Sequence, residues 1–441
     1  MRLSTLLTAA AVGLLAAPAA HAATATTADG NLRYAAAAGE VNNVSFARVS
    51  GNTFRITEFG AMIAAGTGCN QESPNVVTCT TGAGRPIIAN LGDQNDRATS
   101  RTSRTVQLFG EDGNDRLAGA SGRDTLDGGS GDDTLTGSSG GDRVLGGSGN
   151  DQLFGNSGGD RIDGGDGNDL LDGGSGNDNE TGGSGDDTLR ELSAPNGADS
   201  LDGGSGNDTV DYGARSAPVN VVVDDIAADG DRRSNERDNV RSTIDRVLGG
   251  AGSDLLIGRD GADDTLVGGT GDDVIDPRRG NDHVDGGPGI DQISLRDLST
   301  DDVVCGDGVD SVAADLRDTV APDCEKTRRT AAMSIELAGR ARYPTVMLRL
   351  VCPASAFKSC GGRVILATAR KVRPKHGNPR VLTVGVRRFC IPAGTTRRIG
   401  VRIRGAAAPF IGNGIEIRAR LSGFDGAGSA RPSKIRFRLE R

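Results

Sequence analysis

The sequence predicts an all-β protein, and three observations lead to that prediction. A nine-residue unit rich in glycine and aspartate repeats nine times without a gap between Gly110 and Arg190. Each unit has room for only a very short apolar segment, which suits a strand and is too short for a helix. Between residues 334 and 441, several runs alternate apolar and polar residues with the period of two that strands have.

The repeated unit has the same chemistry at fixed positions throughout. Its copies begin at Gly110, Gly119, Gly128, Gly137, Gly146, Gly155, Gly164, Gly173 and Gly182. Glycine occupies positions one and four of every copy, and aspartate occupies position six. Position eight is apolar in all copies but one, at Leu117, Leu126, Leu135, Val144, Leu153, Ile162, Leu171 and Leu189. Glu180 holds position eight in the remaining copy.

These residue types predict a turn followed by a short strand. Fixed glycines mark backbone conformations that a side chain would obstruct. Position five is mostly Asn, Asp or Gly, which tolerate left-handed geometry, so positions one to six are expected to form a turn and positions seven to nine a minimal strand. A carboxylate at each turn, among exposed carbonyls, makes an oxygen-rich site of the kind that Ca²⁺ prefers. An acidic low-complexity linker would not need an apolar residue at a fixed phase.

The pattern resembles the glycine- and aspartate-rich nonapeptide of RTX calcium-binding proteins, G-G-x-G-x-D-x-U-x. The resemblance implies a parallel β-roll in which two repeats make one coil and alternate repeats stack on the same side. Stacked carboxylates would repel one another at the spacing of neighbouring strands, and calcium between successive coils would remove that repulsion. The resemblance therefore makes Ca²⁺ the expected cofactor and partner.

The aspartates at position six are the metal ligands that this resemblance implies. One ladder would contain Asp115, Asp133, Asp151, Asp169 and Asp187, and the other Asp124, Asp142, Asp160 and Asp178. The register breaks at residues 191–196, and further copies supply Asp199, Asp208, Asp254, Asp264, Asp273, Asp282 and Asp291. Glu180 would stand last in the row of Leu126, Val144 and Ile162 before this break, which predicts a looser roll there.

The first residues predict export from the cell. Met1 to Ala22 resembles a secretory signal peptide, with Arg2, an apolar run and an A-x-A cleavage site at Ala20 to Ala22. The apolar run is too short for a membrane anchor, and no later stretch predicts a transmembrane segment. RTX proteins often use an uncleaved carboxy-terminal signal instead, and this chain departs from that pattern. We expect a secreted, extracellular protein.

Charge divides the chain sharply. Residues 1–324 carry 24 Lys and Arg against 54 Asp and Glu, a net charge of −30, and residues 325–441 carry 26 against 5, a net charge of +21; the two sum to −9. The expected domains are a β-rich cap at 23–109, or else a small independent domain there, a first array at 110–211, an interrupting segment at 212–248, a second array at 249–324, and a basic antiparallel β-sandwich at 325–441.

Seven cysteines in a secreted chain suggest disulfides. Proximity in the sequence favours the pairs Cys69–Cys79, Cys305–Cys324 and Cys352–Cys360, although spacing alone does not fix connectivity. The second of these would close the exit end of the second array. Cys390 is left over, and we expect a buried free thiol there, with an intermolecular disulfide as the alternative.

The motifs favour a non-enzymatic protein. There is no H-E-x-x-H, and the two matches to G-x-S-x-G, around Ser139 and Ser157, fall inside the glycine repeats rather than at a strand-to-helix turn. The leading hypothesis is a structural or adhesive role in which calcium drives folding. In the alternative, the basic carboxy-terminal domain binds an anionic cell-envelope polysaccharide and the roll is a spacer. An enzyme of unrecognised class is the third, and nucleic acid is not expected because few aromatics are available for stacking.

Overall fold

The computed structural model describes residues 22–329 apart from 232, 235, 298 and 316, and beyond them the strands of the carboxy-terminal part. The signal segment expected at Met1 to Ala22 lies outside the described residues except for Ala22. The chain divides into two compact units, one up to Leu192 together with Asn196–Thr209, the other Ser193–Pro195 with Val210–Arg441. Among the described residues, no helix has the length and hydropathy that crossing a membrane requires.

The first unit begins with a small β-rich segment. Its elements are β1 (Ala23–Thr26), the short 3₁₀ helix η1 (Ala28–Gly30), β2 (Leu32–Ala35), β3 (Asn43–Ser50), β4 (Thr53–Glu58), β5 (Ile63–Ala65), β6 (Cys69–Ser73) and β7 (Val76–Thr80). The strands β3, β4, β7 and β6 pair antiparallel in that order. Cys69 and Cys79 form the expected disulfide between β6 and β7.

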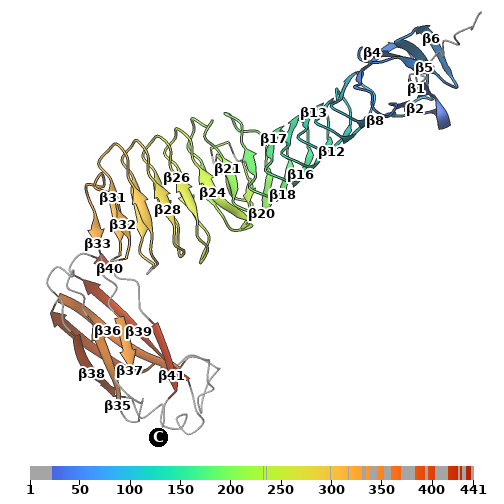
Figure 1. Cartoon of the computed structure of the whole chain (residues 1–441). Coiled ribbons are helices and arrows are strands. Elements are labelled where there is room, and N and C mark those ends of the chain that lie inside the picture. The colour runs from blue at the N-terminus through green and yellow to red at the C-terminus, as the bar shows by residue number, and fades with distance from the viewer. Residues whose placement is uncertain are drawn as a thin grey trace, which may run out of the picture. The chain divides into compact units, whose positions relative to one another are not determined.

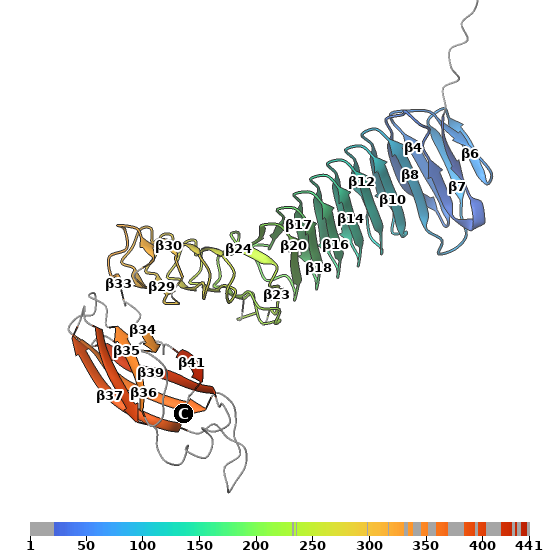
Figure 2. The same cartoon turned by 60° about the horizontal axis from the view of Figure 1, so that its bottom comes forward.

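The array then winds as a parallel solenoid (Figures 1 and 2). One row of strands contains β8 (Ile87–Asp93), β10 (Val106–Asp112), β12 (Thr125–Ser130), β14 (Arg143–Ser148), β16 (Arg161–Asp166), β18 (Asn179–Ser184) and β20 (Ser200–Ser205). The other contains β9 (Arg97–Arg101), β11 (Arg116–Ala118), β13 (Thr134–Ser139), β15 (Gln152–Ser157), β17 (Leu170–Ser175) and β19 (Thr188–Arg190). Partners such as Val144 and Ile162 lie 18 residues apart, so two repeats make one coil, as predicted.

Most strands of this array are twice as long as predicted. Instead of three residues, strands such as β14 have six, because positions one to three of the next copy continue the strand. Position two takes a left-handed backbone within the strand, at φ 104° for Gly129 and 113° for Gly147. A Cβ on Gly147 would lie 2.1 Å from the carbonyl oxygen of Gly129 on the preceding coil. Glycine leaves room for this close approach, and Ser138 and Asn156 pair at the same position with a similar left-handed backbone.

The core is a narrow column of position-eight side chains. Leu117, Leu135, Leu153, Leu171 and Leu189 stack in one row and are buried. The other row contains Leu126, Val144, Ile162, Glu180 and Leu201, also buried. One apolar side chain per repeat makes up the whole apolar core, so each coil buries little apolar area.

The row that holds Glu180 does not end at the register break. Glu180 pairs in register with Leu201 of the next strand, so the coil continues below it. The additional residues after Arg190 are absorbed in the connection, because the ladder hydrogen bond from Asp178 to Asp199 spans 21 residues instead of 18. Glu180 is the last member of its row before the break, as expected, but the insertion lies in a loop and leaves the strands on either side paired in register. The looser roll expected there stays a prediction.

The second unit has its own parallel rows of strands. One contains β24 (Ile244–Leu248), β26 (Thr265–Val267), β28 (His283–Asp285), β30 (Asp302–Val304) and β32 (Thr319–Val320); the other contains β22 (Asn220–Val222), β25 (Leu255–Ile257), β27 (Val274–Asp276), β29 (Gln292–Leu295), β31 (Ser311–Ala314) and β33 (Arg328–Arg329). Most of these strands have the predicted three-residue length. Cys305 and Cys324 form the expected disulfide at the exit end. Strand β21 (Asp208–Asp211) crosses the division between the units.

The interrupting segment is held by buried polar contacts. β22 and β23 (Asn239–Val240) flank the polar residues 224–238 of this segment. Arg215 and Glu236 form a salt bridge of 2.7 Å, with side chains 0 % and 1 % exposed. The hydroxyl of Tyr212 lies 3.0 Å from the Asp238 carboxylate. Charged pairs are buried in proteins only with such partners, so this segment is a folded part of the unit.

The carboxy-terminal strands pair antiparallel, as their alternating sequence predicts. One sheet contains β34 (Ser334–Leu337), β35 (Thr345–Val351) and β38 (Thr396–Arg402). The other contains β36 (Ser359–Thr368), β37 (Thr383–Pro392), β39 (Glu416–Asp425), β40 (Gly428–Ser429) and β41 (Lys434–Arg438). The expected Cys352–Cys360 disulfide and the environment of Cys390 fall outside the described residues and side chains, and the sandwich packing stays a prediction.

Candidate metal-binding ladders

The aspartates of position six stack inside the solenoid, immediately before the strands. The backbone N–H of Asp133 donates to Oδ1 of Asp151, one coil further on, at 2.7 Å. The same bond repeats from coil to coil at 2.7 to 3.0 Å, giving two ladders in the first unit and two in the second. All sixteen predicted aspartates belong to a ladder, and none is more than 4 % exposed.

The second oxygen of these carboxylates is buried and, in most cases, accepts no hydrogen bond. This holds for Oδ2 of Asp115, Asp133, Asp142, Asp151, Asp160, Asp169, Asp178, Asp187, Asp273, Asp282 and Asp291. Except at Asp282, whose copy begins with Pro277, each such oxygen faces the position-one glycine of its own copy. A Cβ on Gly146 would lie 2.3 Å from Oδ2 of Asp151 and 2.4 Å from the carbonyl oxygen of Gly164. Glycine at position one therefore keeps open a cradle lined by a carboxylate and a carbonyl.

Burial and like charges raise the pKa of the ladder carboxyls. The pKa of Asp133 rises to about 7, because burial disfavours the charged form and because Asp151 and Asp115 lie next to it. Burial, with Asp169 as the nearest like charge, raises the pKa of Asp151 to about 6. Ionised carboxylates in such surroundings need a positive charge beside them.

These residues fit a calcium ion. The donors are oxygen atoms only, carboxylate and backbone carbonyl, which are the ligands of Ca²⁺ in proteins. Buried oxygens without a donor identify where a cation would relieve the cost of burial. The shared geometry of the coils repeats the same arrangement along each ladder.

Three predicted ligands are satisfied differently from the others. Asp124 accepts backbone N–H groups of Val106 and Ala120 on its two oxygens. Asp254 accepts those of Val219 and Gly250. Asp264 lies 2.6 Å from Nε of Arg259. In Asp124 and Asp254, a backbone N–H group therefore lies at each of the two carboxylate oxygens.

Arg259 places a cation at the ladder in the copy that begins at Gly258, which has an additional residue. Its guanidinium also lies 2.7 Å from Asp245, and the Asp264 carboxylate is 2 % exposed. Arginine takes the place of a position-two glycine in this copy. The guanidinium supplies at this coil the positive charge that a metal ion would supply at others.

The ladders are longer than the sequence predicted. Asp96 heads one of them, because its N–H donates to Oδ1 of Asp115 and its own Oδ1 accepts the N–H of Asn42. In the second unit Asp301, Asp310 and Asp318 continue the stacks. The degenerate copies at Leu91 to Asp96 and Gly308 to Val312 signal two of these residues. Asp301 follows a turn without glycine, so the sequence feature that indicates it is its position directly before Asp302-Val303.

Position five has a different role from the predicted one. The left-handed residues of the turn are those at positions two and four, such as Gly129 and Gly131, and position five is not among them. Along one edge, its side chain accepts the N–H of the next position five, as in the bond of 2.8 Å from Asn168 to Oδ1 of Asn150. Asn and Asp are favoured there because they form this outer ladder.

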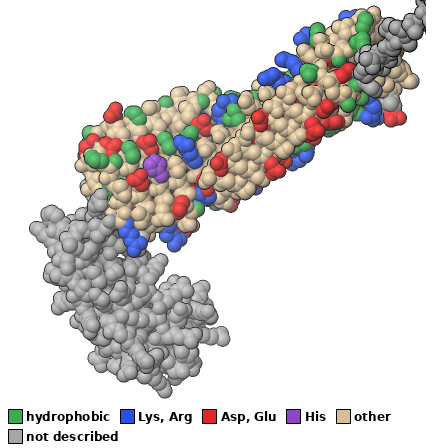
Figure 3. All heavy atoms as spheres, in the orientation of Figure 1, with side chains coloured by type: hydrophobic (Ala, Val, Ile, Leu, Met, Phe, Trp, Pro, Cys, Tyr) green, Lys and Arg blue, Asp and Glu red, His purple; other side chains and the backbone are tan. Residues whose placement is uncertain are grey.

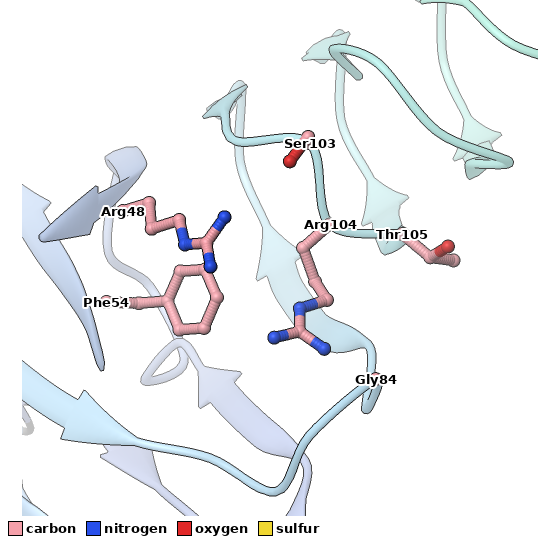
Figure 4. A pocket seen from close by; sticks show the side chains of 6 residues that line it. All are labelled: Arg48, Phe54, Gly84, Ser103, Arg104 and Thr105. Atoms are coloured by element: carbon pink, nitrogen blue, oxygen red, sulfur yellow. The ribbon is translucent and has the colours of Figure 1, made fainter. Parts of the chain in front are cut away.

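The serines of the two G-x-S-x-G matches do not form a nucleophile elbow. Ser139 and Ser157 lie in β13 and β15, with their hydroxyls 3.4 Å apart, and stack as members of a strand row. A cavity of about 290 Å³ beside the entry segment is lined by Arg48, Phe54 and Arg104 with Gly84, Ser103 and Thr105, and has no carboxylate (Figure 4). The face in Figure 3 shows mainly small side chains and backbone over the coils, with scattered acidic and basic groups.

The architecture defines a class of protein: a parallel β-roll of two-repeat coils with buried carboxylate ladders. Comparison with known families specifies it further. The RTX calcium-binding nonapeptide repeat matches residues 109–144, 145–180, 154–189, 193–214, 242–264 and 262–293. The chain thus carries RTX calcium-binding repeats and is a calcium-binding β-roll protein. A search among curated proteins found none that matches it.

Proposed function

We propose that the ladder aspartates, including Asp96, Asp301 and Asp310, hold calcium ions between successive coils, and that these ions complete the fold. The observation that carries the proposal is the row of buried carboxylate oxygens without a hydrogen-bond donor, most of them beside a position-one glycine. A column of one apolar side chain per repeat is a small core. Metal binding that exists only in the folded state adds its free energy to folding.

Different positions of each repeat have different roles in this proposed calcium binding. The position-six carboxylate uses Oδ1 to accept the backbone N–H of the preceding coil and leaves Oδ2 for the ion. The position-one glycine leaves room for the ion, and its counterpart one coil on presents a carbonyl. Calcium, when bound, supplies the positive charge that allows stacked carboxylates to stay ionised.

The role that this architecture supports is structural or adhesive, in a secreted and non-enzymatic protein. Two disulfides suit an oxidising compartment, and the first residues resemble an export signal. A calcium-rigidified roll is a scaffold or spacer. We keep one alternative, in which residues 325–441, with 26 basic against 5 acidic residues, bind an anionic cell-envelope polysaccharide.

Calcium removal tests the proposal. The mature chain with calcium should show strong β signal in circular dichroism and a compact form in small-angle scattering. Addition of a chelator should reduce the β signal of the arrays and expand the chain, and calcium, but not an equal concentration of magnesium, should restore both. A chain whose dichroism and scattering do not respond to the chelator would rule the proposal out.

The alternative has its own measurement. The full mature chain should sediment with an insoluble anionic polysaccharide, and Arg387→Glu with Arg388→Glu should abolish this without changing the calcium response. Arg143→Glu with Arg161→Glu, on the roll, is the matched control. No retention of the parent chain on the polysaccharide would leave the structural role as the one supported.

A further inference from the structure

One turn of the second unit departs from the repeat and brings an additional carboxylate to a ladder. Residues 295–301 stand where a regular copy has positions one to six, and this stretch has one additional residue and no glycine. Asp301 at its end still holds the ladder position, because its Oδ1 accepts the N–H of Asp282 at 3.1 Å. Asp297 is the third residue of this turn. The third residues Asp112 and Asp166 of regular copies are exposed, whereas Asp297 is half-buried.

Three carboxylates meet at this turn. Oxygen atoms of Asp282, Asp297 and Asp301 all lie within 4.8 Å of one another. Three successive aspartates of a regular ladder cannot do this, because each step between coils is already about 4.8 Å. Asp282 and Asp301 are 2 % and 1 % exposed, and Oδ2 of each is buried without a hydrogen-bond donor.

Asp297 is held by a contact within its own turn and interacts with a basic residue of the neighbouring coil. Oδ1 of Asp297 accepts the N–H of Ser299 at 2.8 Å, which fixes the turn. Arg279 on the neighbouring coil interacts electrostatically with Asp297. Its guanidinium is exposed and makes its hydrogen bonds to Asp260. Three acidic groups at this distance repel one another strongly when ionised, so the cluster is suited to a divalent cation.

We propose that Asp282, Asp297 and Asp301 form a three-carboxylate calcium site that binds more tightly than the sites between regular coils and fills first in this unit. The inference rests on the proposed function, since it takes the ladders to be calcium sites. Affinity for calcium rises with the number of charged ligands. A longer, glycine-free turn is what allows the third carboxylate to turn inward, and the ion in return fixes that turn.

The test uses the full mature chain and the variant Asp297→Asn. Asparagine keeps an oxygen for the Ser299 N–H and removes one charge. Asp307→Asn is the matched control, because Asp307 is the third residue of the following copy and is exposed. Native mass spectrometry at limiting calcium counts the ions on each chain, and hydrogen exchange follows peptides covering 279–304 and, for comparison, 110–190.

In the parent chain and in Asp307→Asn, the first calcium ions should protect residues 295–304 from exchange. Asp297→Asn should weaken that site by roughly 10- to 100-fold, the usual effect of altering a metal's surroundings, while 110–190 is unchanged. Equal binding and protection in Asp297→Asn and the parent would overturn the inference, as would equal losses in the two variants. A parent chain that binds no calcium at all would instead refute the proposed function.

Discussion

Replacing Glu180 by leucine should stabilise the calcium-bound roll. Glu180 is 1 % exposed and stands between Ile162 and Leu201 in an otherwise apolar row. Its Oε1 accepts the N–H of Gly173 at 3.0 Å, and its Oε2 is buried without a donor. Burial, together with Glu191, Asp199 and Asp178, raises the pKa of this carboxyl well above its usual range.

The magnitude follows from three contributions. A buried leucine side chain contributes about 1.5–3 kcal/mol. Removing a carboxyl that is buried with one oxygen unpaired gains about 1–3 kcal/mol. Leaving the Gly173 N–H without an acceptor costs about 1–3 kcal/mol. The two polar contributions offset each other, so Glu180→Leu should raise the free energy of unfolding by about 1–2 kcal/mol, the lower part of the apolar range because packing is imperfect.

Urea unfolding of the mature chain at saturating calcium and pH 7.5 measures this change. Glu180→Gln, which keeps an acceptor for Gly173, should gain less than Glu180→Leu. Ile162→Glu, one coil higher in the same row, is the matched opposite and should clearly destabilise. A Glu180→Leu chain that unfolds at lower urea than the parent would refute the account of this row.

Four other outcomes are expected. In chelator, the roll should keep more β signal in circular dichroism at pH 5 than at pH 8. The folded-state pKa of Asp133 is about 7 and that of Asp151 about 6, against an ordinary value of 3.8, so the stability that these groups contribute below pH 3.8 is lost as pH rises through 6 to 7. The opposite trend would contradict buried ladders. Gly146→Ala should destabilise the calcium-bound form by about 1–3 kcal/mol, because its Cβ would meet Asp151 Oδ2 at 2.3 Å, whereas Gly141→Ala, whose Cβ meets nothing closer than 3.2 Å, should melt close to the parent. Arg259→Gln should lower the stability of the second unit in chelator by about 1–3 kcal/mol, since Asp245 and Asp264 lose their cation; unchanged hydrogen exchange at 244–267 would count against that role. Replacing Cys305 and Cys324 together by serine should reduce the free energy of unfolding by roughly 2–4 kcal/mol, and an unchanged urea midpoint would show that the disulfide is dispensable.

The sequence predicts the fold best where one residue type is forced at a fixed period. The buried position-eight rows follow from the spacing, the 18-residue coil follows from the resemblance to RTX repeats, and proximity in the sequence favours the Cys69–Cys79 and Cys305–Cys324 disulfides. The ladder aspartates follow for the same reason, since every regular copy keeps its aspartate. Each of these repeat features depends on one residue type that recurs at one position, so the repeat in the sequence is enough to indicate it.

Features that depend on contact between coils are hidden from a single repeat. The longer strands arise because position two takes a left-handed backbone, at Ser138 and Asn156 as well as at Gly147, which position-by-position propensity does not show. Asp301 is missed because its turn has no glycine to mark it. The buried pair of Arg215 and Glu236 comes from a stretch whose composition is that of a solvent-exposed loop.

The ladder hydrogen bonds all point the same way along the chain, from each aspartate N–H to the carboxylate of a later coil. A stack of coils therefore has unlike ends, one with acceptors to offer and one with donors. Two bare stacks of this kind would be complementary head to tail and would join into open filaments, as heterologous contacts do. Asn42 supplies the donor that Asp96 needs at one end, and Glu325 supplies the acceptor for Asp310 at another. The backbone N–H of Asn42 and the side chain of Glu325 therefore occupy these two ladder ends, where another stack would otherwise pair.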